Sequence, residues 1–160
     1  MSGVHATREI RLVVNGEEVV HQVAVRRLLA DFLREDLGLT ATRLACEHGV
    51  CGACTVILDG RSVRSCLLFA VQADGAEVRT VEGMAEGDRM HPLQKAFWDH
   101  HAIQCGFCTS GFLMTALELV ESRSSAEEEE VRQALSGNLC RCTGYANVVA
   151  AVLAVLKDRA

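Results

Sequence analysis

The chain begins with two stretches in which apolar and polar residues alternate. Residues 9–14 and 18–25 both show this pattern, which is typical of half-buried strands. The dipeptide Asn15-Gly16 lies between them. Both of its residues accept positive φ, so the dipeptide favours a type I′ turn. The pattern therefore predicts a β-hairpin at the start of the fold.

The next pattern has helical spacing. Apolar residues recur over 28–37 with charged residues between them, and Gly38 follows directly. This predicts an amphipathic helix with a glycine at its C-cap. Further short apolar runs predict strands at 55–58, 61–64 and 77–81. Two strands, a helix and further strands around a cysteine-rich loop indicate a small β-grasp sheet with a helix across it.

The periodicity changes near the middle of the chain. Residues 82–90 contain two glycines, alternating charge and little periodicity, so we expect a domain boundary here, between domains 1–84 and 85–160. Beyond it the pattern is helical. Ser125, with Glu128 three residues later, suggests a capping box. The expected helices are 93–100, 111–121, 126–136 and 147–157.

Composition limits the possible functions. The 160 residues are 49% hydrophobic and can bury a core, and the formal charge of −5 argues against nucleic acid as a main partner. No apolar run approaches the roughly 18 residues of a membrane span. Residues 1–11 have neither an apolar core nor a twin arginine, so we expect an unprocessed, cytoplasmic protein.

Cysteine dominates the candidate chemistry. The first four cysteines follow the pattern C-x4-C-x2-C with one more downstream, which matches plant-type [2Fe-2S] spacing. Gly49 and Gly52 permit the turns that such a loop needs and leave no side chain in the way of a cluster. A Zn(Cys)4 site and disulfides are the alternatives, although zinc more often uses two separate C-x2-4-C corners. The set comprises Cys46, Cys51, Cys54 and Cys66.

The second set is less diagnostic. It combines C-x2-C with a distant C-x-C: Cys105, Cys108, Cys140 and Cys142. Spacing alone leaves zinc and an iron–sulfur cluster both open. Thr109 and Thr143 each follow a cysteine and precede a helix. As N-caps they would point helix dipoles at the sulfurs, which favours a negatively charged centre.

Three stretches together resemble a known family. CEHGVCGACTV followed by Cys66, then QCGFCTSGF, then GNLCRCTGY, resemble the small iron–sulfur subunit of the molybdenum hydroxylases. This family includes xanthine dehydrogenase, aldehyde oxidoreductase and aerobic carbon monoxide dehydrogenase. The resemblance covers nearly the whole chain. It implies an α+β protein, with a β-grasp, plant-type ferredoxin-like domain followed by a four-helix-bundle [2Fe-2S] domain.

The resemblance also implies ligands and partners. The first four cysteines would hold the ferredoxin-type cluster and the last four the helical-domain cluster. Gln104 and the Cys142 sulfur match positions that contact the pterin of a molybdopterin cofactor on a large subunit. The other cluster would face FAD on a medium subunit. The complex would be a heterotrimer or a dimer of heterotrimers, and electrons would pass from molybdenum through both clusters to FAD.

Some features leave alternatives. Ser110 stands where many family members have proline, at a helix position where proline is favoured but not required. His48 is expected to be a loop residue rather than a ligand. A free-standing ferredoxin-type carrier is the second interpretation and a structural zinc module the third. The substrate stays open among purines, N-heteroaromatics, aldehydes, carbon monoxide and aroyl-CoA thioesters.

Overall fold

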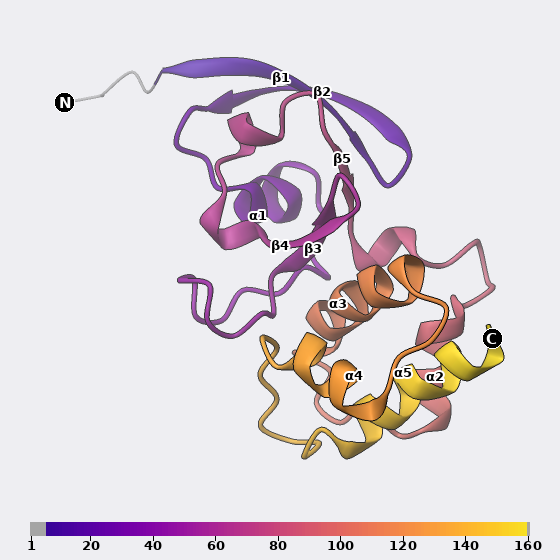
Figure 1. Ribbon diagram of the computed structural model, residues 1–160. Coiled ribbons are helices and arrows are strands. Elements are labelled where there is room, and N and C mark those ends of the chain that lie inside the picture. The colour runs from indigo at the N-terminus through magenta and orange to yellow at the C-terminus, as the bar shows by residue number, and fades with distance from the viewer. Residues whose placement is uncertain (1–5, 160) are drawn as a thin grey trace.

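The computed structural model describes residues 6–159, so the predicted domain ends at residues 1 and 160 lie outside the described residues. Figure 1 shows a strand-rich part built from the first half of this range, with a helical part packed beneath it. No helix within the described range is long and apolar enough to cross a membrane.

The strand-rich part is a mixed sheet in the order β2-β1-β5-β3-β4, in which β1 and β5 are parallel and the other neighbours are antiparallel. The predicted hairpin is confirmed: Asn15 and Gly16 have φ values of 51° and 86° and join β1 to β2. The predicted strand at 77–81 is shorter than expected. The strands are β1 (Thr7–Val14), β2 (Glu17–Ala24), β3 (Thr55–Leu58), β4 (Arg61–Arg64) and β5 (Glu77–Arg79).

The predicted amphipathic helix is present but irregular. It consists of α1 (Leu29–Asp31) and a π-helical turn over Phe32–Asp36, in which the Leu37 amide donates to the Phe32 carbonyl at 3.1 Å. The wider turn is compatible with burial of Phe32 and Leu33 against the sheet. Gly38 follows with φ 73°, as expected for a glycine that ends a helix. This sheet with a helix across it is the predicted β-grasp fold.

The second half forms the predicted helices. α3 is nearly surrounded by protein and α4 and α5 pack beside it (Figure 1). The capping prediction for α4 was wrong, because the chain stays extended through Glu127. The helix therefore begins at Glu128, and the Glu130 carboxylate accepts from the Glu127 amide at 2.9 Å. The helices are α2 (Pro92–Asp99), α3 (Thr109–Ser122), α4 (Glu128–Leu135) and α5 (Ala146–Asp158).

The two parts pack directly on each other through β3. Successive side chains of a strand point to opposite faces. Accordingly, Val56 lies in the core between the sheet and α1, whereas Ile57, on the opposite face, lies in the core of the helical part. Arg79 of β5 pairs with Glu121 of α3 at 2.5 Å at the edge of this contact. The continuous apolar run of β3 is thus explained by burial on both faces.

Candidate metal centres

The first cysteine set is assembled by one loop and one short turn. The loop before β3 carries Cys46, Cys51 and Cys54, and it bends through positive φ at Gly49 and Gly52, 83° and 74°. Cys66 comes from a 3₁₀ turn over Ser65–Leu67, directly after β4. The β3–β4 hairpin therefore brings the fourth thiol to the loop.

The four thiols of this set lie in two pairs. Cys54 and Cys66 are buried together, at 2% and 4% exposure. Burial and the neighbouring Cys54 thiol raise the pKa of Cys66 to about 11. Cys46 and Cys51 form the more exposed pair. Hydrogen bonds from backbone amides, first that of Cys51 at 3.3 Å, lower the pKa of Cys46 to about 6.

The second set lies on two corners of the helical part. Cys105 and Cys108 come from the turn between α2 and α3, and Cys140 and Cys142 from the segment between α4 and α5. The Sγ atoms of Cys105 and Cys142 are 3.7 Å apart. Cys108 interacts with Cys140 as a second pair. Both thiols of the first pair are exposed, whereas those of the second are half-buried.

In the second set, the pKa values of Cys108 and Cys140 are shifted in opposite directions. Burial and the Cys140 thiol raise the pKa of Cys108 to about 12. Burial also acts to raise the pKa of Cys140, but hydrogen bonds outweigh it and lower this pKa to about 7. They come from the Thr143 hydroxyl at 3.2 Å and the amides of Thr143 and Cys142, each at 3.4 Å. Such amide and hydroxyl donors stabilise sulfur in its anionic form.

This pairwise arrangement fits two-iron clusters better than single ions. A [2Fe-2S] cluster takes two protein ligands on each of its two irons, whereas zinc needs four ligands around one ion. Within residues 6–159, no group of three or more histidine, cysteine or acidic side chains is arranged to hold one metal ion. Because thiols bind metal as thiolates, iron binding would release protons from Cys66 and Cys108.

Two local predictions need correction. Thr109 is the first residue of α3, whose N-cap is Cys108, and the N-cap of α5 is Tyr145 in the left-handed conformation. Neither predicted threonine is therefore an N-cap, because the chain turns into α3 one residue earlier and into α5 two residues later. Thr143 instead donates directly to the Cys140 sulfur.

The loop glycines also serve a purpose that the spacing did not indicate. A Cβ on Gly49 would lie 2.5 Å from Leu67 Cδ1, and a Cβ on Gly52 would lie 2.5 Å from the Gly137 carbonyl oxygen. The missing side chains therefore make room for neighbouring protein segments. Nothing in the local sequence around Gly52 predicts a contact with residue 137.

Gln104 lies beside the exposed thiol pair. Its side chain is exposed and makes no hydrogen bond to any residue in the range 6–159. It therefore neither caps a turn nor bonds to local backbone. His48 is also exposed, and its Nδ1 contacts the Cys46 carbonyl oxygen rather than joining the thiols.

The sequence patterns did not identify Asn138, which lies between the two cysteine sets. It is 2% exposed, and its Nδ2 donates to the Gly52 carbonyl at 3.0 Å. The adjacent Leu139 amide donates to the Cys51 carbonyl at 2.9 Å. The two thiol-bearing loops are thus hydrogen-bonded to each other.

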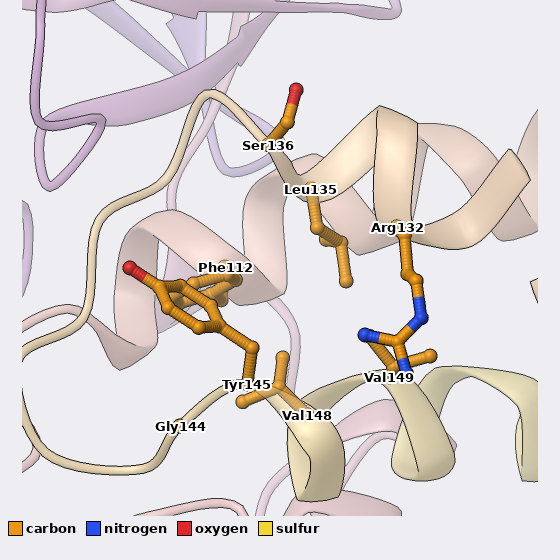
Figure 2. A pocket seen from close by; sticks show the side chains of 8 residues that line it. All are labelled: Phe112, Arg132, Leu135, Ser136, Gly144, Tyr145, Val148 and Val149. Atoms are coloured by element: carbon orange, nitrogen blue, oxygen red, sulfur yellow. The ribbon is translucent and has the colours of Figure 1, made fainter. Parts of the chain in front are cut away.

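A pocket of about 270 Å³ lies behind the second set, between α3, α4 and the start of α5. Figure 2 shows Tyr145 beside Phe112 at one end and Arg132 reaching from α4 toward Val149 of α5 at the other. The two rings are packed edge to face, with their centroids 6.3 Å apart. The Tyr145 hydroxyl accepts from the Cys140 amide at 3.0 Å, so this ring connects the pocket wall to the cysteine corner.

Comparison with known proteins gives two family matches. Residues 12–85 match the family described as "2Fe-2S iron-sulfur cluster binding domain", and residues 80–153 match the "[2Fe-2S] binding domain" family. Each match contains one of the two cysteine sets.

Similar proteins cover almost the full length. The nicotine 6-hydroxylase small subunit of Paenarthrobacter nicotinovorans is 58% identical over 145 residues, 91% of this chain and 87% of that protein. The caffeine dehydrogenase subunit gamma of Pseudomonas sp. (strain CBB1) is 51% identical over 149 residues, covering 91% and 89%. The crystal structure of quinoline 2-oxidoreductase from Pseudomonas putida 86 aligns with a TM-score of 0.92 and 46% identity, covering 96% of both chains.

Proposed function

Because this chain belongs to the small iron–sulfur subunits of the molybdenum hydroxylases, which are electron-transfer subunits with two [2Fe-2S] clusters, we propose its place in the enzyme as follows. It relays electrons from a molybdopterin centre on a large subunit, through its own two clusters, to FAD on a medium subunit. The relatives are named as subunits of larger enzymes, and this chain likewise has partner subunits. The proposed assembly is a heterotrimer or a dimer of heterotrimers.

The eight thiols are the proposed ligands, and their pairing is the observation that carries the proposal. A bound [2Fe-2S] cluster supplies one-electron redox chemistry. The chain's own residues hold the irons and tune them: buried thiols shield one side, and amide or hydroxyl donors stabilise sulfur charge at Cys46 and Cys140. The ferredoxin-type set is Cys46, Cys51, Cys54 and Cys66, and the helical set is Cys105, Cys108, Cys140 and Cys142.

Each set belongs to its own proposed domain, residues 1–84 and 85–160. The presence of two apolar cores, one between the sheet and α1 and one among the helices, supports this division, although Ile57 and Met84 of the first range pack in the second core. The two family matches, which overlap only at residues 80–85, support it too. With all eight cysteines proposed as cluster ligands, none is assigned to a disulfide, which suits a reducing compartment, and the proposed location is the cytoplasm.

The exposure of two thiols of the helical set supports the proposal that this set faces the pterin. Cys105 and Cys142 present their thiols at the surface beside Gln104, whose amide is unpaired within the described range. Phe107 and Leu139 are 45% and 50% exposed at the same corner. Exposed apolar residues around a redox centre suit a contact with another subunit, and the large subunit is the proposed partner here.

A free-standing ferredoxin-type carrier is the alternative. It would leave this apolar corner in water and the Gln104 amide without a partner. Purification separates the two functions: the proposed subunit co-purifies with larger subunits from its native host, whereas a free carrier purifies as a stable, cluster-loaded monomer.

Metal analysis of the assembled complex tests the two sites directly. We expect about four irons and four acid-labile sulfides per copy of this chain, with the visible absorption of iron–sulfur clusters. About two of each would contradict the assignment of one set. Stoichiometric zinc and no colour would contradict the redox function.

The proposal extends to the substrate class. The relatives described above are named for nicotine, caffeine and quinoline, all of which are nitrogen heteroaromatic compounds. The proposed holoenzyme therefore oxidises an N-heteroaromatic substrate. Anaerobic addition of nicotine or quinoline to the complex should bleach the cluster absorption, and bleaching by benzaldehyde alone would contradict this choice.

A further inference from the structure

Asn138 is the centre of the contact between the two cysteine sets. Its side chain is buried and fully engaged: Nδ2 donates to the Gly52 carbonyl at 3.0 Å, and Oδ1 accepts from the Thr115 hydroxyl at 2.9 Å. Gly52 lies in the first cysteine loop and Thr115 in α3, whereas Asn138 precedes Cys140. One amide therefore holds three segments at one point.

The contact is too tight to accept even one extra carbon atom. A Cβ on Gly111, in the first turn of α3, would lie 2.2 Å from the Gly52 carbonyl oxygen and 3.0 Å from Asn138 Nδ2. A Cβ on Gly52 would lie 2.7 Å from the same Nδ2. Arg64 adds a second connection, because its Nη2 donates to the Gly137 carbonyl at 2.6 Å. Close packing and hydrogen bonds therefore fix the distance between the loop that carries Gly52 and the segment that carries Asn138.

The contact around Asn138 also positions a backbone hydrogen bond between the two thiol-bearing loops. The Leu139 amide donates to the Cys51 carbonyl at 2.9 Å, and Leu139 is bonded to Cys140. Cys51 belongs to the ferredoxin-type set and Cys140 to the helical set. Only one hydrogen bond and one intervening residue thus join a thiol-bearing residue of one site to one of the other.

We propose that Asn138 is a positioning residue for electron transfer between the two clusters: it holds the Leu139–Cys51 hydrogen bond in place as the bonded route from one cysteine set to the other. One electron leaves the helical cluster, which is oxidised, and arrives at the ferredoxin-type cluster, which is reduced. No covalent bond forms or breaks and no proton is transferred. This inference rests on the proposed function, since it requires both sites to hold clusters.

The test uses the chain in its complex with the partner subunits. Asn138→Ala removes the amide, and Asn138→Asp keeps the size and an acceptor for Thr115 but loses the donor to Gly52. Asn147→Ala is the matched control, because this asparagine is exposed and, within residues 6–159, its side chain donates only to the His101 carbonyl, at 3.3 Å. Iron and sulfide are counted first. Pulse radiolysis then measures the rate at which an injected electron re-equilibrates between the clusters, and EPR of the doubly reduced complex measures their magnetic interaction.

We expect full iron content in all variants. In Asn138→Ala, the rate of electron re-equilibration should fall about tenfold, because small displacements strongly affect steps that depend on positioning. The magnetic interaction between the two clusters should also be weaker in this variant. The aspartate variant should be slowed as well, because a buried carboxylate oxygen would face the Gly52 carbonyl oxygen in place of the amide donor, and the control should be unchanged. Wild-type rates in both Asn138 variants with full clusters would overturn the inference and leave the proposed function intact. Loss of a cluster in both variants would also overturn it, because the contact would then serve assembly. A wild-type complex without two clusters would contradict the proposed function itself.

Discussion

At the scale of single residues, the first turn of α3 contains a hydroxyl without a partner. Ser110 is 8% exposed, and its Oγ is the buried side-chain oxygen or nitrogen within residues 6–159 that lacks a hydrogen bond. A buried, unsatisfied hydroxyl costs about 1–3 kcal/mol. We expect Ser110→Ala to raise the free energy of unfolding by about 1 kcal/mol. Chemical denaturation of the cluster-loaded chain measures this change.

The matched comparison is Thr115 in the same helix, which is also 8% exposed. Its hydroxyl donates to Asn138 at 2.9 Å. Thr115→Ala should therefore lower the free energy of unfolding by about 1–3 kcal/mol, because Asn138 Oδ1 loses its partner. If both alanine variants changed stability in the same direction, the hydrogen-bond argument would be wrong.

Gln104 is the second residue-scale case. The backbone of this residue is held beside Cys105, while its side chain is exposed without a hydrogen bond in the described range. We expect Gln104→Ala to leave both clusters assembled and to remove about one hydrogen bond to the pterin, on the order of 1 kcal/mol. Rapid-reduction kinetics on the complex should show slower reduction of the helical-domain cluster. A wild-type rate with unchanged cofactor occupancy would show that Gln104 does not contact the pterin.

At the scale of elements, α2 depends on a histidine cap. His91 Nδ1 accepts from the Leu93 amide at 3.2 Å, which requires this nitrogen to be unprotonated. Burial lowers the pKa of His91 below its ordinary value of 6.5, and charged neighbours act in both directions. Glu121 and Glu86 raise this pKa, whereas Arg159 and Arg79 lower it. Of these four charges, Glu121 has the largest effect and Glu86 the smallest.

The pH dependence follows from this direction. Since the folded-state pKa lies below the unfolded value, the unfolded chain binds the proton more readily, and stability falls as the pH drops below about 6.5. The loss should approach about 1 kcal/mol, the worth of an N-cap. His91→Asn keeps an acceptor that does not titrate. Denaturation at about pH 5 and pH 8 should show a smaller acid loss in this variant than in the wild type, and equal losses would contradict the role of the cap.

At the scale of the whole molecule, the two parts meet where Gly111 passes the Gly52 carbonyl. Gly111→Ala would place a Cβ 2.2 Å from that backbone oxygen. Neither element can move freely, so we expect a loss of about 1–3 kcal/mol, as for overpacked cores. In Gly137→Ala, the new Cβ meets the end of the Arg64 side chain, at 2.7 Å. A side-chain end can shift more readily than backbone, even at the cost of its hydrogen bond to Gly137, so the loss should be smaller. Thermal or chemical unfolding compares the two variants, and equal losses would contradict the packing argument.

The sequence alone determined those features that depend on near neighbours. The Asn15-Gly16 hairpin, the helix ended by Gly38 and the strand at 55–58 follow from φ preferences and periodicity, which act over a few residues. The family and its two-cluster function were predicted from the resemblance of three short continuous stretches to known proteins, whereas the spacing of the second cysteine set alone left zinc and a cluster both open. The capping prediction at Ser125 was wrong, because cap choice depends on where the extended chain ends.

The features that bring the two sites together depend on tertiary structure. The Asn138–Gly52 hydrogen bond joins residues 86 positions apart, and no periodic pattern encodes a single contact at that separation. The burial of β3 on both faces likewise depends on α3 packing beneath the sheet. The pairing of thiols and the difference between the pKa of Cys46 and that of Cys66 arise from how folded loops share amides and exclude water. Local sequence patterns predict the turns of each cysteine loop, whereas tertiary packing sets the distance between the two loops and the exposure of each thiol.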